Sequence, residues 1–163
     1  MALFGSSRDV VMFKGVATEF VHDVITQQIG YYKIILPDTP SNVYGEGLVK
    51  DYIGPILIDC LIVRGDFNTR NGDFGPDTLR TVDFRFLTDD LVYANVVPEV
   101  GDVVMYNESY YEVDNVNQNQ FILGKDPQYA YSEGLQFFGS SFSIILNTHL
   151  TEPERLGILA QRL

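Results

Sequence analysis

The sequence predicts a mainly β fold, a small β-barrel or sandwich with one N-terminal amphipathic helix and short helical additions. Several short segments alternate apolar and polar residues, and turn-forming Gly, Pro, Asn and Asp recur about every ten residues. Only one early segment has clear helical spacing. We expect the 163 residues to form a single domain, with an N-terminal arm at 1–17, the helix and barrel at 18–150 and a C-terminal docking tail at 151–163.

The amphipathic helix is predicted at residues 18–30. Thr18 can cap its start, and Gly30 can adopt the left-handed conformation that ends a helix. The apolar residues recur at three- and four-residue steps and share one face: Phe20, Val21, Val24, Ile25 and Ile29. We expect this face to pack on the chain's own sheet, and packing on a second subunit is the alternative.

From residue 31 the sequence pattern becomes that of strands. They are predicted at residues 31–36, 52–63, 80–86, 120–123 and 142–149, with a hairpin closed around residues 106–109. A short helix is expected to start with Thr88 or Asp89 as its cap. The segment 52–63 is apolar almost throughout, which places Cys60 in the core. Because Cys60 is the only cysteine, an internal disulfide and a zinc knuckle are excluded.

Residues 65–78 are rich in Gly, Asp and Asn and predict a long exposed loop. Long loops in compact domains often carry function, so we treat it as a candidate functional loop, for which the family resemblance described below implies a channel or gating role. Its candidate residues are Asp66, Phe67, Arg70, Asp73 and Phe74. The spacing superficially resembles a calcium loop, but Arg70 stands where an oxygen ligand is required, so we expect no metal there.

The C-terminal residues 151–163 predict a short helix or tail with a narrow apolar stripe. A segment of this length does not fold alone, so it docks either on its own barrel or on another subunit. We favour the second, and the candidate interface residues are Arg155, Leu156, Ile158, Leu159 and Leu163.

Catalytic signatures are absent from the sequence. His22 and His149 lack the neighbours of an H-E-x-x-H or a nucleophile–base motif, and we expect neither enzyme activity nor a cofactor. Tyr110 and Tyr111 could stack on single-stranded nucleic acid, but their neighbours are acidic. On alternation, we expect one of the two tyrosines in the core and the other at the rim.

The chain is strongly acidic, with 22 acidic and 11 basic residues and a net charge of −11. This charge argues against binding nucleic acid through general phosphate neutralisation. It suits either a passage through which DNA slides without sticking or simply a soluble surface. The N-terminus has no signal-peptide pattern and the chain has no long apolar run. We therefore expect a soluble protein that is made in the cytoplasm and does not enter a membrane.

Three stretches, in this order, carry a family resemblance. Residues 31–49 read YYKIILPDTPSNVYGEGLV, and residues 74–91 read FGPDTLRTVDFRFLTDDL. Residues 98–119 contain the turn Gly101-Asp102 and the sequence Tyr111-Glu112-Val113. Together these stretches resemble the neck (head-completion) proteins of contractile-tailed bacteriophages, over roughly residues 31–150. The hairpin pattern alone is shared by many head–tail joining proteins, whereas the three stretches in order are more specific.

The resemblance implies a structural protein of the virion neck, at the head–tail junction. Such proteins form a ring, generally six-fold, that closes the DNA-filled head and provides the platform for tail attachment. The implied partners are other copies of the chain, the portal or adaptor neck protein above, and the tail terminator or tail below. Packaged DNA would pass non-specifically through the ring.

Two other functions remain open from the sequence. The chain could be a tail-terminator or baseplate ring component, which would share the ring but not its position. It could instead be an OB-like module that binds nucleic acid or a ligand, which would require a basic or aromatic groove.

Overall fold

The computed structural model describes residues 7–35, 50–72, 75–120, 142–152 and 156. An N-terminal helix continues into one π-helical segment, and a second, short helix lies between strands. The helical elements are α1 (Ser7–Glu19), η1 (Phe20–Ile25) and α2 (Thr88–Tyr93). The strands are β1 (Gln28–Ile34), β2 (Tyr52–Asp59), β3 (Leu61–Gly72), β4 (Gly75–Leu87), β5 (Val103–Tyr106), β6 (Ser109–Gln120) and β7 (Ser143–Thr151).

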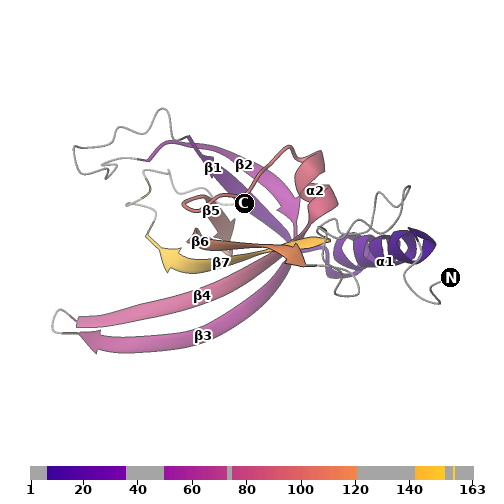
Figure 1. Ribbon diagram of the computed structural model, residues 1–163. Coiled ribbons are helices and arrows are strands. Elements are labelled where there is room, and N and C mark those ends of the chain that lie inside the picture. The colour runs from indigo at the N-terminus through magenta and orange to yellow at the C-terminus, as the bar shows by residue number, and fades with distance from the viewer. Residues whose placement is uncertain (1–6, 36–49, 73–74, 121–141, 153–155, 157–163) are drawn as a thin grey trace.

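The strands form one antiparallel sheet in the order β2-β1-β5-β6-β7-β4-β3. The predicted mainly β class is confirmed, and the sheet is open rather than closed into a barrel. Its two edge strands, β2 and β3, are consecutive in the chain and separated only by Cys60. The edges therefore start from a common corner and diverge across the curled sheet (Figure 1).

The centre of the sheet is buried on both faces. Tyr31 and Tyr32 are adjacent in β1 and point to opposite faces, and each lies in a separate apolar cluster. The larger cluster includes Tyr31, Phe84, Phe86, Val104, Tyr111, Val113 and Leu146. The smaller cluster consists of Tyr32, Val103, Met105, Tyr110 and Leu156. Tyr110 and Tyr111 are consequently both buried, and the expectation that one lies at the rim is wrong.

The N-terminal helix begins earlier than predicted. Ser7–Glu19 is already helical, within the segment expected to be an arm, and Thr26 ends the helical region with a φ of 49°. Gly30 instead lies within β1, where it pairs with Leu57 and Met105. The expected packing of the apolar face on the chain's own sheet holds for Val21, which is buried, but not for Val24, which is exposed.

The predicted loop at residues 65–78 is wrong, because most of it is β structure. β3 and β4 pair down to Gly72 and Gly75 and form a long hairpin that projects from the body (Figure 1). A bulge interrupts the ladder between Arg64 and Phe67, at Gly65. A Cβ atom on Gly65 would collide with the Thr81 side chain, so this close crossing of the strands requires glycine. We call this hairpin the β3–β4 arm.

The single strand predicted at residues 52–63 is wrong, because the chain breaks at Cys60 into β2 and the start of β3, which lie at opposite edges of the sheet. Most of the remaining predicted elements agree with the structure in their position. Residues 80–86 lie in β4 with Val82, Phe84 and Phe86 buried, and the final strand is β7. The predicted hairpin turns at Asn107 and Glu108, both with positive φ, which is typical of a two-residue hairpin turn. The helix α2 is also confirmed, although neither expected cap forms, since Leu87 occupies the N-cap without a side-chain hydrogen bond. Residues 121–123 lie outside the described part of the chain.

Candidate assembly surfaces

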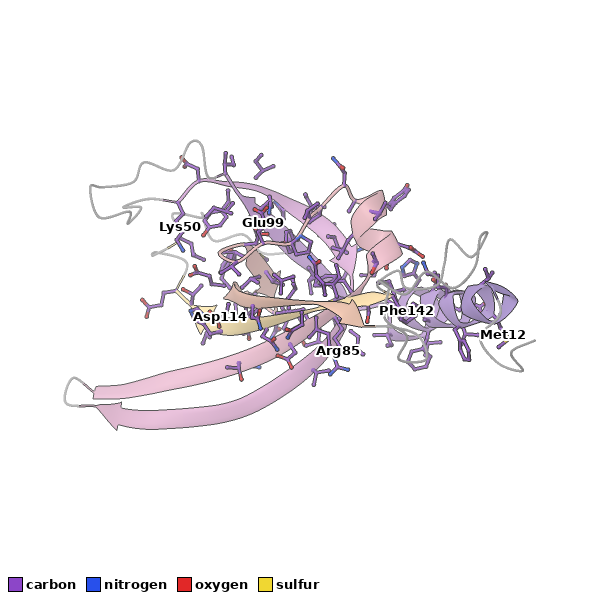
Figure 2. All side chains as sticks on the ribbon, viewed as in Figure 1. Met12, Lys50, Arg85, Glu99, Asp114 and Phe142 are labelled. Atoms are coloured by element: carbon purple, nitrogen blue, oxygen red, sulfur yellow. The ribbon has the colours of Figure 1, made fainter. Side chains whose placement is uncertain are left out.

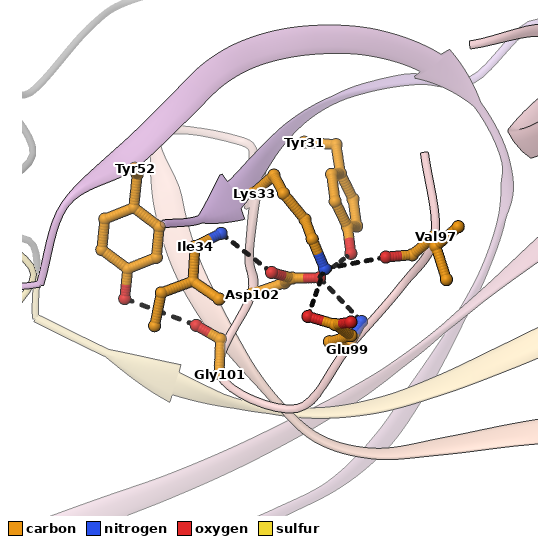
Figure 3. A network of polar contacts seen from close by, with 8 residues as sticks. All are labelled: Tyr31, Lys33, Ile34, Tyr52, Val97, Glu99, Gly101 and Asp102. Carbon is orange, nitrogen blue, oxygen red and sulfur yellow. Dashed lines mark hydrogen bonds and ion pairs between the residues drawn. The ribbon is translucent and has the colours of Figure 1, made fainter. Parts of the chain in front are cut away.

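A buried carboxylate organises the turn before β5. Asp102 is fully buried, and its side chain accepts hydrogen bonds from the Tyr31 hydroxyl, the Lys33 ammonium and the backbone N–H groups of Ile34 and Glu99 (Figure 3). The distances lie between 2.5 Å for Tyr31 and 3.1 Å for Lys33. A buried charge is tolerated only with such partners, so the network fixes the turn against β1.

Lys33 extends this network to the surface. Its ammonium lies 2.8 Å from Glu99 Oε2 and donates a hydrogen bond of 2.8 Å to the carbonyl oxygen of Val97. Burial, and then the negative charge of Asp102, raises the pKa of Tyr31 far above its ordinary value. The Tyr31 hydroxyl therefore stays protonated and donates a hydrogen bond to Asp102. The segment from Val97 to Asp102 is held in one conformation by these contacts.

This rigid segment and α2 together display four exposed apolar side chains. They are Val92, Tyr93, Val97 and Val100, and we call them the knob. Tyr93 is 95% exposed, which is unusual for an aromatic side chain at the end of a helix. The neighbouring Leu91 is buried in the core and anchors α2 to the body. Val92 and Tyr93 thus lie on a helix that Leu91 holds to the body, and Val97 and Val100 lie in the segment that the Asp102 network fixes.

A second apolar surface lies between the N-terminal helical region and the sheet. A groove of about 600 Å³ runs between α1 and η1 on one side and the ends of β3, β4 and β7 on the other. Its lining is almost entirely apolar and includes Phe13, Val16, Phe20, Phe86 and Phe142. Arg85 is the one charged residue of the lining, and Figure 2 shows it near Phe142 at the base of α1. We call this surface the groove.

Two surface ion pairs tether α1 and η1 to α2. Lys14 contacts both carboxylate oxygens of Asp89 at 2.9 Å, and His22 Nε2 lies 3.0 Å from Asp90. The hydrogen bond to Asp90 raises the pKa of His22 above its ordinary value, although burial opposes this shift. Pairs of this kind contribute about 0–1 kcal/mol each, so the helix is held less firmly than the sheet.

The predicted gating residues fall on the β3–β4 arm. Asp66, Phe67 and Arg70 belong to β3, whereas Asp73 and Phe74 lie outside the described residues. The structure thus brings the first three together on one projecting strand, away from α1 (Figure 1). Their assignment to a channel stays a prediction.

Of the five predicted interface residues in the C-terminal tail, the structure describes Leu156 alone. Leu156 is buried against Tyr32, Val103, Met105 and Tyr110 of its own sheet, which is the alternative that the sequence left open. The other four tail residues, Arg155, Ile158, Leu159 and Leu163, lie outside the described residues. Leu156 closes the second face of the sheet and is not available to another subunit.

The described residues contain no group of three or more His, Cys, Asp or Glu that could hold a metal ion. Cys60 is buried as predicted, and burial together with the charge of Asp59 raises its pKa to about 12, so the thiolate is scarce at neutral pH. His149 Nδ1 contacts Asp114 at 2.8 Å on the surface. In this part of the chain, no helix is long and apolar enough to cross a membrane.

The knob and the groove were missed by the sequence reasoning. The sequence analysis predicts only a short helix near Val92 and an N-terminal arm at residues 1–17, without an association surface at either place. A signal was present, because Met12, Val16, Phe20 and Val24 recur every four residues and extend the apolar face upstream. The pocket itself needed the fold, since strands distant in sequence supply its other wall.

Comparisons with known proteins do not assign this chain to a family. No family model matches the chain, and no curated protein matches its sequence. Among solved structures, a chain from the "Virion of native gene transfer agent (GTA) particle" is similar at 10% sequence identity with a TM-score of 0.45. The match covers 76% of this chain and 91% of that chain. At these values the likeness establishes neither a common fold nor a common function.

Proposed function

We propose that this chain is a structural virion protein of the head–tail connector, which forms a ring that closes the DNA-filled head and receives the tail. The observation that carries the proposal is the presence of two different exposed apolar surfaces, the knob and the groove, on one small chain. Exposed apolar surfaces of this kind mark sites of protein association. Two different surfaces on identical subunits suit a head-to-tail contact that repeats into a ring.

Two further features support the proposal. The three stretches that resemble phage neck proteins include most of β1, all of β4, most of α2 and nearly all of the β5–β6 hairpin. The net charge of −11 suits a ring that DNA crosses without adhering. The groove is lined by apolar residues and one arginine, which does not suit an extended nucleic-acid site.

The β3–β4 arm takes the place of the loop as the candidate gate. Its reach from the body would let Asp66, Phe67 and Arg70 contact a neighbouring ring or the DNA channel. Deleting residues 68–71 and 76–79 removes four paired positions from each strand, keeps the turn and leaves every other side chain on its original face. Particles carrying this deletion should leak DNA or fail to eject it. Unchanged DNA retention and infectivity would contradict the proposal that the arm is a gate.

The position in the virion is tested by electron microscopy of lysates from a virus lacking this gene. Heads that package DNA but leak it, beside complete unattached tails, are the expected result. Complementation with the wild-type gene should restore joined particles and serves as the control. Sealed heads with overlong or incomplete tails would instead identify a tail-terminator or baseplate component and overturn the neck position.

A further inference from the structure

We infer that the groove of one copy of this chain receives the knob of the next copy, with Tyr93 as the anchor. The inference rests on the proposed ring in that it names the contact between its subunits. It concerns a surface that can be examined in the purified protein. Its test is therefore independent of where the ring lies in a virion.

The N-terminal helical region carries an exposed apolar stripe, of which Val16 and Phe20 line the groove. Met12, Val16, Phe20 and Val24 recur at four-residue steps, and each is more than half exposed. α1 projects from the sheet with most of its surface free of other described elements (Figure 1). A stripe of this kind on a soluble chain needs a covering surface.

The groove matches an aromatic side chain in chemistry and in size. Aromatic rings line it from both walls, with Phe13 and Phe20 on the helical side and Phe86 and Phe142 on the sheet side. Aromatic side chains bury about 150–250 Å² each and favour edge-to-face contacts with other rings. A volume of about 600 Å³ admits the Tyr93 ring together with a neighbouring valine of the knob.

The charges around the two surfaces are complementary. Arg85 is exposed at the groove, and no acidic side chain within the described residues pairs with it. Glu99 lies between Val97 and Val100 of the knob and is about half exposed, with Lys33 as its present partner. In the contact, Arg85 of one copy would face Glu99 of the next, which sets the orientation more than the affinity.

The occupant is a second copy because the chain does not fill its own groove. Tyr93 is 95% exposed in the isolated chain, so its own groove does not hold it. Arg85 and Phe142 lie at the base of α1, and α2 lies on the other side of that base (Figures 1 and 2). A contact between two different surfaces is heterologous, and its repetition gives a closed ring or an open polymer.

Cysteine cross-linking of mixed variants tests the contact. Val16→Cys carries the thiol in the groove, and Val92→Cys, which leaves the Tyr93 anchor in place, carries it on the knob of a copy with a longer affinity tag. Mild oxidation of the mixture should give the mixed dimer at least about tenfold above either variant alone. The buried Cys60, with its raised pKa, contributes little background.

Glu152→Cys provides the matched control for the knob. Glu152 is exposed just after β7 ends, at the opposite end of that strand from Ser143, which lines the groove. Its mixture with Val16→Cys should give no mixed dimer above background. Homodimers of Val16→Cys alone would indicate a symmetric contact between two grooves and would overturn the inference.

Sedimentation velocity of the purified protein over a concentration series gives a second readout. Tyr93→Ala should weaken self-association at least about tenfold, with an unchanged melting temperature, because Tyr93 contacts solvent. A wild-type protein that stays monomeric without cross-links, or a Tyr93→Ala variant that associates normally, overturns the inference. Open filaments would support the contact while opposing the ring, and the gene-deletion phenotype decides the neck position separately.

Discussion

The centre of the sheet and the N-terminal helical region differ in how much of their apolar surface is buried. At the centre, β1, β5 and β6 are covered on both faces, and the one buried carboxylate, Asp102, is fully satisfied among the described residues. The N-terminal region instead leaves an apolar stripe in solvent and relies on the ion pairs of Lys14 and His22. The first region is therefore expected to contribute most to stability, and the second provides the exposed apolar surface on which the proposed association rests.

Removal of the Asp102 carboxylate should have the largest effect on folding. Asp102→Ala leaves the Lys33 charge and the Tyr31 hydroxyl without their buried partner. We expect a loss of about 3–5 kcal/mol in the free energy of unfolding, measured by denaturant titration followed by circular dichroism. Asp114→Ala is the control, because its partner His149 is at the surface, and it should cost less than about 1 kcal/mol. Equal losses in the two variants would contradict the comparison.

Deletion of one hydroxyl from the same network should cost less. Tyr31→Phe keeps the ring in the core but removes the hydrogen bond to Asp102. Because the acceptor is charged and buried, we expect a loss of about 1.5–3 kcal/mol in the same titration. Tyr106→Phe is a matched control, since within the described residues its hydroxyl accepts a hydrogen bond only from Arg64, at 3.4 Å. A Tyr31→Phe protein as stable as the wild type would contradict the stabilising role assigned to the hydrogen bonds of Asp102.

The attachment of the N-terminal helix should depend on pH. The pKa of His22 is raised in the folded state by its hydrogen bond to Asp90. Its contribution to stability is therefore full below the unfolded pKa of about 6.5 and is lost as the pH rises through the folded pKa. Hydrogen exchange of α1 amides should accelerate over that interval, beyond the intrinsic base catalysis. His22→Gln should abolish this excess, and its persistence in that variant would exclude His22 as the cause.

Changes in the knob should have the smallest effect on folding. Val97 and Tyr93 are exposed, so Tyr93→Ala and Val97→Ser should change the free energy of unfolding by no more than about 0.5 kcal/mol. Thermal unfolding at low protein concentration, where the chain is monomeric, provides the measurement. A loss of 2 kcal/mol or more, on the order of a core truncation, would mean that the knob belongs to the core.

The sequence predicted those parts of the fold that local patterns determine. The alternation of Val82, Phe84 and Phe86 specified a strand, and the apolar run around Cys60 specified burial. The β3–β4 arm was missed because its strands pair through the backbone, and the Gly, Asp and Asn content of residues 65–78 indicated a loop. Backbone pairing alone leaves no periodic pattern in the sequence.

Long-range contacts account for the other differences. Tyr111 is buried in the larger cluster, and Tyr110 is buried on the opposite face together with Leu156, which comes from a distant part of the chain. The groove likewise requires Phe13 and Phe142 to meet, although they lie near opposite ends of the sequence. Local periodicity carries no information about such pairs, so the candidate surfaces emerged only with the fold.

The Asp102 network and the weak tethers of α1 have a mechanical consequence for assembly. Asp102 and Lys33 hold the backbone of the knob in one conformation. Little conformational entropy would therefore be lost when the knob binds a groove. The helix opposite is compliant, because two ion pairs of about 0–1 kcal/mol each let it tilt at low energetic cost. In the proposed contact, a rigid knob and a helix that can tilt would together accommodate small differences in angle between successive subunits, so that the ring can still close.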